Sequence, residues 1–224
     1  MNAAHFNSID QTFVRVLGRP LTHLTPRYVW DRVNVAKFQW LHPDLPWLTS
    51  DAVVLLEQLL RPSDEGLEFG SGRSTIWFAK RSKHLVSVEH SAEWYERVKA
   101  KLASEKLDNV DLKLARANED NQNDPCKIPY IEAGGALATG SKDYVLVDGM
   151  YRGECALKAV EILRPGGVII TDNIEWYIPG HTRTPFATTE IVGAAWARFV
   201  ELTRGWRSIW TTSGVTDTAI WFKP

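Results

Sequence analysis

The sequence predicts an α/β protein built on a doubly wound, mostly parallel sheet. Three features support this prediction: apolar runs that end in acidic or amide side chains, amphipathic helices between these runs, and a glycine-rich turn after the first run. Strands that alternate with helices form a parallel sheet, because each helix carries the chain back to the starting edge. Ligands of such sheets bind at the carboxyl ends of the strands. The acidic and amide residues at those ends are Glu68, Glu89, Asp148, Asp172 and Asn173.

The predicted elements follow one another from residue 47 to the end of the chain. Thr49 precedes a helix with apolar residues at positions 52, 55, 56 and 59, the spacing of one helical face. Further helices are expected at 74–81, after Ser91, at 152–163 and at 187–202. Five strands are expected at 66–70, 84–90, 110–116, 144–149 and 168–172. The last two strands, 207–212 and 218–222, flank a Ser213-Gly214 turn and are expected to form an antiparallel hairpin.

Two segments lie outside this pattern. Residues 1–46 form an N-terminal extension that we expect to pack on the domain as a cap, with a short helix at 13–17 and irregular, tryptophan-rich structure after Pro20. Residues 120–142 form a long polar connection, and connections of this length within a compact domain are often functional. The chain from 47 to 224 is expected to be one domain, because the length fits one α/β domain with additions and neither an internal repeat nor a second domain is visible.

The composition restricts the kinds of partner. The 224 residues carry a net charge of -1, so no excess of basic side chains is available for a nucleic acid backbone. The two cysteines, Cys126 and Cys155, form neither a metal-binding motif nor a disulfide framework, which favours the cytoplasm. No apolar run is long enough to span a membrane. We therefore expect a cytoplasmic protein with a small-molecule partner, no nucleic acid and no membrane, and we leave a homodimer open.

The glycine-rich turn has the order Glu68-x-Gly70-x-Gly72. Glycine lets the chain turn tightly and lets a ligand approach the backbone. The fingerprint of dinucleotide-binding proteins needs a third glycine where this chain has Thr75. The turn therefore fits an acid-x-Gly-x-Gly cofactor site better than a nicotinamide dinucleotide site. A turn that binds nothing is the alternative.

Glu89 ends the second strand, close to the spacing of about 20 residues from the glycine turn that ribose-binding acids show. A carboxylate at this position accepts hydrogen bonds from two ribose hydroxyls, which a neutral acceptor does less well. The end of the third strand, followed by Ala117 and Asn118, is where an adenine ring would lie. The alternative for Glu89 is a solvated strand end.

Four segments occur at the positions that a known family uses: LEFGSG at 67–72, VEH at 88–90, VDG at 147–149 and LRPGG at 163–167. Together they resemble the class I S-adenosylmethionine-dependent methyltransferases, and the resemblance covers the chain from residue 47. It implies a Rossmann-like sheet of seven strands with a C-terminal antiparallel hairpin, and S-adenosylmethionine as the cofactor. The expected cofactor-binding residues are Glu68, Gly70, Ser71, Gly72, Ser74, Glu89, His90, Ala117, Asn118 and Asp148.

Asp148, Asp172 and Asn173 also resemble part of the metal-dependent O-methyltransferases, which act on catechols and caffeoyl thioesters. In that subfamily an acid after the fourth strand and an Asp-Asn pair after the fifth bind a divalent cation. The resemblance implies Mg²⁺ bound by these three side chains, since hard oxygen ligands suit this ion. Residues 149–153 depart from the subfamily. The alternative is that Asp148 lies under the cofactor and that Asp172-Asn173 caps the following loop.

The expected reaction is methyl transfer from S-adenosylmethionine to an oxygen of a small molecule, such as a sugar or a phenol-like hydroxyl. This reaction needs alignment of the acceptor with the methyl group and a proton acceptor. Asp148 and His181 are the candidate catalytic residues. Two other functions compete with this one: an NAD(P)-binding oxidoreductase, and a non-catalytic binding protein that keeps the fold.

Overall fold

One seven-stranded sheet organises residues 24–117, 125–135 and 138–224, which are the residues that this computed structural model describes. The strands are β1 (Glu65–Phe69), β2 (His84–Glu89), β3 (Val110–Leu114), β4 (Lys142–Val147), β5 (Leu163–Asp172), β6 (Arg207–Thr212) and β7 (Asp217–Phe222). The helices are α2 (Pro26–Leu41), α3 (Ser50–Leu59), α4 (Arg73–Ala79), α5 (Ala92–Glu105), α6 (Lys127–Gly135), α7 (Arg152–Ile162), the short η2 (Ile174–Trp176) and α8 (Gly193–Leu202). None of these described helices combines the length and the apolar character needed to cross a membrane.

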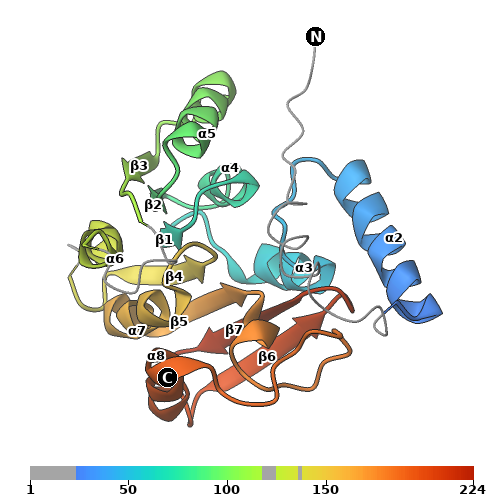
Figure 1. Ribbon diagram of the computed structural model, residues 1–224. Coiled ribbons are helices and arrows are strands. Elements are labelled where there is room, and N and C mark those ends of the chain that lie inside the picture. Colours follow the sequence, from blue (N-terminus) through green and yellow to red (C-terminus); the bar gives the residue numbers. More distant parts are fainter. Residues whose placement is uncertain (1–23, 118–124, 136–137) are drawn as a thin grey trace.

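The strand order is β3-β2-β1-β4-β5-β7-β6 (Figure 1). Strands β1 to β5 run parallel, and β7 pairs antiparallel with both β5 and β6. This arrangement confirms the doubly wound sheet with a C-terminal hairpin. The chain order reverses between β1 and β4, because β2 and β3 extend the sheet on one side of β1 and the later strands extend it on the other. A ligand crevice is expected at such a switch point, at the carboxyl ends of β1 and β4.

Helices cover both faces of the sheet (Figure 1). On one face, α3 and α4 contribute Leu56 and Phe78, both fully buried, to an apolar cluster with the central strands. On the other face, α6, α7 and α8 contribute Tyr130, Ala159 and Phe199 to a second cluster. Burial of one large apolar side chain stabilises the fold by about 1.5–3 kcal/mol. The two clusters therefore hold the carboxyl ends of the strands in place from both sides.

Strand β5 begins at Leu163, although the sequence at 163–167 predicted a stop between a helix and a later strand. The Gly166 N–H group donates to the Lys223 carbonyl (2.9 Å), and the Lys223 N–H group donates to the Gly167 carbonyl (3.0 Å). These hydrogen bonds extend the pairing of β5 beyond the end of β7. Leu163 itself pairs with Lys142 of β4. The segment is therefore part of the strand because residues on both sides of it in the sheet supply its partners.

Helix α8 begins at Gly193, whereas the apolar pattern predicted a helix from residue 187. The Thr188 N–H group donates to the Glu175 carbonyl (2.7 Å), and the Val192 N–H group donates to the Tyr177 carbonyl (2.8 Å). These donors bind the loop after β5 in place of a helical turn, so the helix starts only after them.

Helix α2 occupies a segment for which the sequence predicted irregular structure. Thr25 caps this helix by accepting a hydrogen bond from the Tyr28 N–H group (3.2 Å). Pro26 follows at the first helical position, where the missing N–H group costs no hydrogen bond. Pro26 therefore marks the start of a helix, although the prolines of this region were expected to mark turns. The predicted helix at 13–17 stays a prediction, because residues 1–23 lie outside the described part of the chain. The predicted boundary of the extension at 46 also stays a prediction.

Candidate functional site

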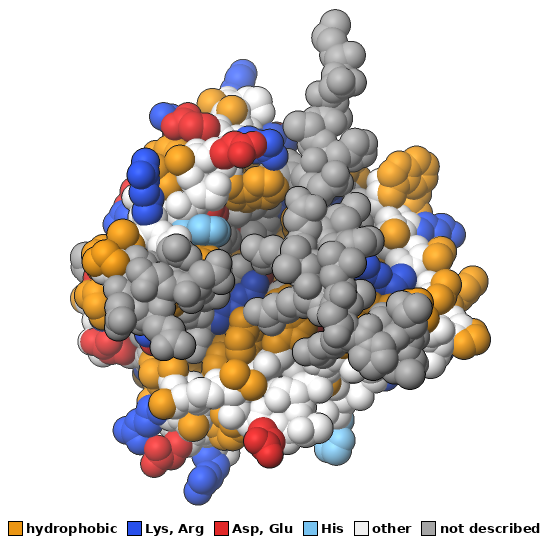
Figure 2. Space-filling model, in the orientation of Figure 1, with side chains coloured by type: hydrophobic (Ala, Val, Ile, Leu, Met, Phe, Trp, Pro, Cys, Tyr) orange, Lys and Arg blue, Asp and Glu red, His pale blue; other side chains and the backbone are white. Residues whose placement is uncertain are grey.

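A cavity of about 500 Å³ lies at the carboxyl ends of β1, β2, β4 and β5. It is lined by the turn between β1 and α4, by the residues that follow β2 and β4, and by the end of β5. Helix α2 and the turn between β6 and β7 complete the lining. Figure 2 shows basic side chains within the hollow on this face of the molecule. The cavity therefore lies at the switch point of the sheet and has the size of a small-molecule site.

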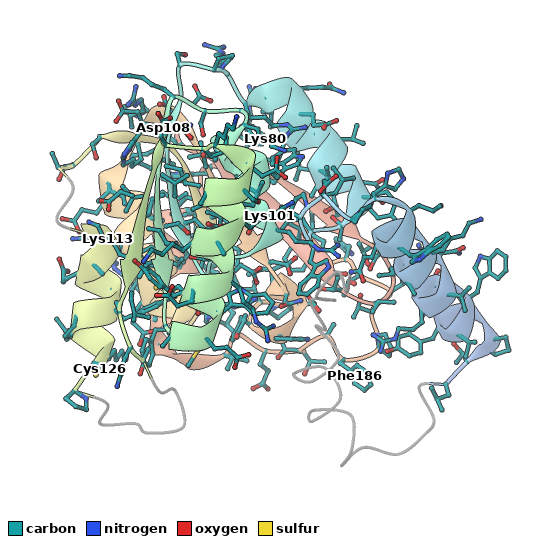
Figure 3. The ribbon with its side chains drawn as sticks, turned by 90° about the horizontal axis from the view of Figure 1, so that it is seen from above. Lys80, Lys101, Asp108, Lys113, Cys126 and Phe186 are labelled. Atoms are coloured by element: carbon teal, nitrogen blue, oxygen red, sulfur yellow. The ribbon has the colours of Figure 1, made fainter. Side chains whose placement is uncertain are left out.

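Two sets of contacts fix α2 beside this cavity. Tyr28 packs edge-on against Phe186, with ring centroids 6.4 Å apart, and Figure 3 shows Phe186 beside α2. Asp31 is buried, and its carboxylate lies 3.6 Å from a guanidinium nitrogen of Arg27 and 3.8 Å from one of Arg183. The contacts with Phe186 and Arg183 join α2 to the loop after β5, so α2 is one wall of the cavity.

The glycine turn is held against the end of β4. Gly70 has a φ of +93°, and a Cβ atom there would lie 2.8 Å from the carbonyl carbon and oxygen of Asp148. Only glycine fits this position, because both the positive φ and the close approach exclude a side chain. Gly72 differs, since the nearest heavy atom to an added Cβ atom is Trp94 Nε1 at 3.7 Å. Gly70 therefore builds the turn, whereas Gly72 keeps the cavity open beside it.

The Glu89 carboxylate connects the two turns that border the cavity. One oxygen accepts a hydrogen bond from the Ser71 N–H group (3.0 Å), and the other accepts from the N–H groups of His90 (2.9 Å) and Ser91 (2.7 Å). His90 Nδ1 lies 3.0 Å from the same carboxylate without forming a hydrogen bond. Glu89 is only 2% exposed, yet it lines the cavity. This side chain therefore orders the site and reaches the space where a ligand would bind.

Arg152 lies between the residues that end β4 and β5. Its Nη2 donates to Asp148 Oδ1 (2.8 Å), and its Nη1 donates to the Asp172 carbonyl (2.6 Å) and to Asn173 Oδ1 (2.9 Å). The Asp172 carboxylate accepts a hydrogen bond from Thr218 Oγ1 (2.8 Å). The side chain of Arg152 is 8% exposed and that of Asp148 is 29% exposed. Asp148 is therefore held in one orientation while it still faces the cavity.

The surroundings of the two acids at these strand ends affect their pKa values differently. Burial raises the pKa of Asp172 to about 8, and the nearby charge of Asp148 adds to this rise. Burial also raises the pKa of Asp148, but the Arg152 guanidinium opposes that rise by stabilising the ionised form. Burial therefore favours the protonated form of Asp172, whereas the Arg152 guanidinium favours the ionised form of Asp148.

Comparison with solved structures identifies the fold, although no family model and no curated protein matches the sequence. The structure is similar to a putative caffeoyl-CoA O-methyltransferase from Staphylococcus aureus, with a TM-score of 0.53 and 17% identity over 95% of this chain and 98% of that chain. It is also similar to a precorrin 8w decarboxylase from Methanobacterium thermoautotrophicum (TM-score 0.51, 18% identity, 81% and 94% covered). A putative methyltransferase from Streptococcus mutans in complex with SAH (S-adenosylhomocysteine) gives a TM-score of 0.50 and 10% identity over 76% and 94%. The chain has the fold of the class I methyltransferases.

Within this methyltransferase fold, the structure brings most of the predicted cofactor-binding residues to one cavity. Those that line it are Gly70, Ser71, Gly72, Ser74, Glu89, His90 and Asp148. Ala117 is half-buried against the core and does not line the cavity. Asn118 lies outside the described residues. Contact of these two residues with a cofactor stays a prediction.

Glu68 lies below the glycine turn instead of in the cavity. The residue is fully buried, and its carboxylate accepts hydrogen bonds from Thr75 Oγ1 (2.6 Å) and Ser87 Oγ (2.5 Å). Burial raises its pKa to about 7. Its side chain leaves the strand on the side of α4, so the carboxylate fastens the turn to that helix and to β2. The expected direct contact of Glu68 with the cofactor is therefore corrected to support of the turn.

The metal site expected at Asp148, Asp172 and Asn173 does not fit this geometry. The Arg152 guanidinium already donates hydrogen bonds to the side chains of Asp148 and Asn173, and the Asp172 carboxylate accepts a hydrogen bond from Thr218. A divalent cation among these ligands would meet the positive charge of the guanidinium, and Coulomb repulsion opposes that approach. An arginine of the chain therefore takes the place that the sequence assigned to magnesium.

His181, the second candidate catalytic residue, is exposed and does not line the cavity. The preceding Gly180 packs against the ring of Trp210 on β6, where a Cβ atom would lie 2.7 Å from a ring carbon. His181 therefore lies over the outer hairpin and not at the carboxyl ends of the central strands. The structure brings only Asp148, of the two candidates, to the cavity.

Three arginines of the cavity were missed at the level of sequence: Arg32, Arg73 and Arg152. Arg152 follows Asp148 by four residues, but this spacing predicts a contact of opposite charges only when both residues lie on one helix, and Asp148 precedes α7. Arg73 directly follows Gly72, and the glycine pattern of this turn predicts nothing about the residue that comes after it. Arg32 gave no signal, because α2 was not expected.

Proposed function

We propose that this protein is an S-adenosylmethionine-dependent methyltransferase that methylates an oxygen of a small molecule without a metal ion. The observation that carries the proposal is one cavity with a glycine turn tied to Glu89 on one side and Asp148 on the other. The class I methyltransferase fold supports this cofactor. An ionised acid beside the cavity supports an acceptor that must lose a proton.

The residues of the chain have separate tasks in the proposed reaction. The cofactor supplies a methyl group that is activated on a sulfonium. Gly72 and Glu89 position the cofactor, which aligns the methyl group with the acceptor. Asp148 accepts the proton of the acceptor hydroxyl, whose oxygen forms a bond to the methyl carbon as the carbon–sulfur bond breaks. Arg152 keeps Asp148 ionised and oriented, so the proton acceptor is ready when the acceptor binds.

The NAD(P)-binding alternative has less support. Thr75, at the position of the third glycine of the dinucleotide fingerprint, is fully buried. Its Oγ1 accepts a hydrogen bond from the Gly72 N–H group (2.9 Å) and donates to Glu68. The turn thus satisfies one of its own N–H groups, which a pyrophosphate would otherwise use. A non-catalytic protein is disfavoured by a cavity of about 500 Å³ that keeps an acid in it.

Calorimetry with SAH and, separately, with NADH and NADPH tests the cofactor. We expect SAH to bind and both nicotinamide dinucleotides not to bind. The acceptor is then sought with a methyl-labelled donor in a mixture of small metabolites, and nuclear magnetic resonance of the product shows whether the new methyl group is on oxygen. Binding of NADH without binding of SAH would overturn the proposal, as would a product methylated on nitrogen or carbon.

A further inference from the structure

Two arginines on the α2 side of the cavity have no ion-pair or hydrogen-bond partner in the part of the chain that the structure describes. Arg73 is the first residue of α4 and Arg32 belongs to α2, and both line the cavity. Arg73 lies 5.1 Å from the centre of the Trp47 ring, and Arg32 lies 5.9 Å from that of the Tyr28 ring. Neither arginine forms an ion pair or a hydrogen bond with a described residue.

Arg73 is the stronger of the two indications. Its Nη1 atom is buried and has no hydrogen-bond partner among the described residues. Burial lowers the pKa of this guanidinium, and Asp44 opposes the shift, but Asp44 is exposed and forms no ion pair with it. The guanidinium keeps its charge at neutral pH. A buried charged donor without an acceptor costs free energy, which an anionic ligand would recover.

The acids of the cavity do not balance these two charges. Glu89 accepts hydrogen bonds from main-chain N–H groups, and Asp148 is paired with Arg152. Asp172 is 4% exposed, and its carboxylate accepts a hydrogen bond from Thr218. The side of the cavity formed by α2 and the start of α4 is therefore positive, which attracts an anion.

Given the proposed function, on which this inference rests, we propose that the methyl acceptor carries a carboxylate or a phosphate that Arg73 and Arg32 bind. Guanidinium N–H groups match the oxygens of either group in pairs. Trp47 covers the flat face of Arg73, which leaves the N–H edge for the anion. Arg32 lies on α2, outside the strand–helix units that carry the glycine turn and Glu89, so we assign this anion to the acceptor and not to the cofactor. The acceptor is an acidic hydroxy compound and not a neutral sugar or phenol.

Inorganic phosphate and acetate are suitable probes of this anion site. Each is titrated at constant ionic strength into the full-length protein saturated with SAH, and binding is measured by calorimetry. We expect binding to the wild type and about tenfold or more weaker binding to Arg73→Gln and to Arg32→Gln. The matched control is Arg198→Gln, which removes the same charge from an exposed pair with Glu201 on α8 and should bind as the wild type does. The proposal is overturned if neither probe binds, or if either cavity variant binds both probes as tightly as the wild type.

A second comparison separates the acceptor from the cofactor, whose amino-acid part also carries a carboxylate. SAH and methylthioadenosine share the nucleoside and the sulfur, but only SAH has that carboxylate. We expect Arg73→Gln to leave both affinities unchanged. If the variant weakens SAH binding alone, about tenfold or more, Arg73 serves the cofactor and the acceptor proposal is overturned. If SAH does not bind the wild type, the proposed function fails, and phosphate titration of the cofactor-free protein still decides whether the anion site exists.

Discussion

At the scale of single residues, Glu89 is expected to decide the affinity for the cofactor. The Glu89 carboxylate accepts hydrogen bonds from the N–H groups of Ser71 and Ser91. This carboxylate also faces the part of the cavity where the ribose hydroxyls are expected. Glu89→Ala should lose about 1.5–3 kcal/mol of binding free energy, which is roughly a ten- to hundredfold loss of SAH affinity. Calorimetry measures the loss, and Glu93→Ala, at an exposed acid on α5, is the control. Equal SAH affinities for Glu89→Ala and the wild type would place the ribose elsewhere.

Asp148 is expected to act on the rate and not on cofactor affinity. Asp148→Asn keeps the shape of the side chain and an oxygen for Arg152, but it removes the proton acceptor. We expect turnover to fall by about 10²- to 10⁴-fold, with SAH affinity close to that of the wild type. Turnover of the wild type should rise with pH as Asp148 loses its proton, and the residual rate of the variant should lack this rise. Asp108→Asn, at an exposed acid between α5 and β3, is the control (Figure 3).

Arg152 leads us to expect that the protein does not depend on a divalent cation. Its guanidinium contacts both Asp148 and Asn173, so a cation near these ligands is repelled. Titration of Mn²⁺ into the SAH complex, followed by electron paramagnetic resonance of the free ion, should show no site at micromolar concentrations. EDTA should leave turnover unchanged. Tight Mn²⁺ binding that is lost in Asp148→Asn would restore the magnesium site and remove Arg152 from its proposed role.

At the scale of secondary-structure elements, the turn between β1 and α4 contains two glycines with different tasks. A side chain at Gly70 would meet the backbone of Asp148, whereas one at Gly72 has room and lines the cavity. Gly72→Val should therefore remain folded, with a melting temperature near that of the wild type, and should lose at least about tenfold in SAH affinity. Gly70→Val should lower the melting temperature, because the strand ends must move apart. Thermal unfolding and calorimetry measure the two effects. Tight SAH binding by folded Gly72→Val would show that the cofactor does not use this turn.

The elements that could be predicted from sequence are those whose signals are local. Strands β1 and β4 are short apolar runs that end in Glu68-x-Gly70 and Asp148-Gly149, and their structure follows that pattern. The predicted starts of strand β5 and helix α8 are wrong, because hydrogen-bond partners from other parts of the chain determine where these two elements begin. Helix α2 was missed for a different reason: Thr25-Pro26 is a local helix start, but several other prolines made the segment look irregular.

At the scale of the whole molecule, the site could be predicted only in part. Acids at strand ends are predictable, because parallel strands deliver their carboxyl ends to one edge. Which of these acids face the cavity cannot be predicted, because Glu68 and Glu89 both lie at strand ends and only Glu89 of these two lines the cavity. Whether positive side chains reach the cavity depends on where α2 and α7 lie relative to the sheet. Sequence alone therefore predicted a metal ion where the fold places Arg152.

Three buried carboxyl groups are expected to make the whole fold less stable as the pH rises. Burial raises the pKa of Glu68 to about 7, that of Asp172 to about 8 and that of Glu175 to about 9. In the unfolded chain these groups have ordinary values of 4.5 for Glu and 3.8 for Asp. Between about pH 5 and pH 9 the folded state therefore binds more protons than the unfolded state, so the free energy of unfolding falls as the pH rises. Below about pH 3 both states are protonated, and these groups no longer change the stability.

Urea unfolding of the cofactor-free protein at several pH values between about 5 and 9 measures this slope. Glu175→Gln is the diagnostic variant, because its amide oxygen can still accept the Asp217 N–H group that Glu175 Oε2 accepts at 3.1 Å. The variant cannot ionise, so its stability should fall less steeply with pH than that of the wild type. Glu161→Gln, at a side chain 56% exposed on α7, should keep the wild-type slope. Stability that rises from about pH 5 to pH 9, or equal slopes for Glu175→Gln and the wild type, would show that these carboxyl groups are ionised in the folded protein.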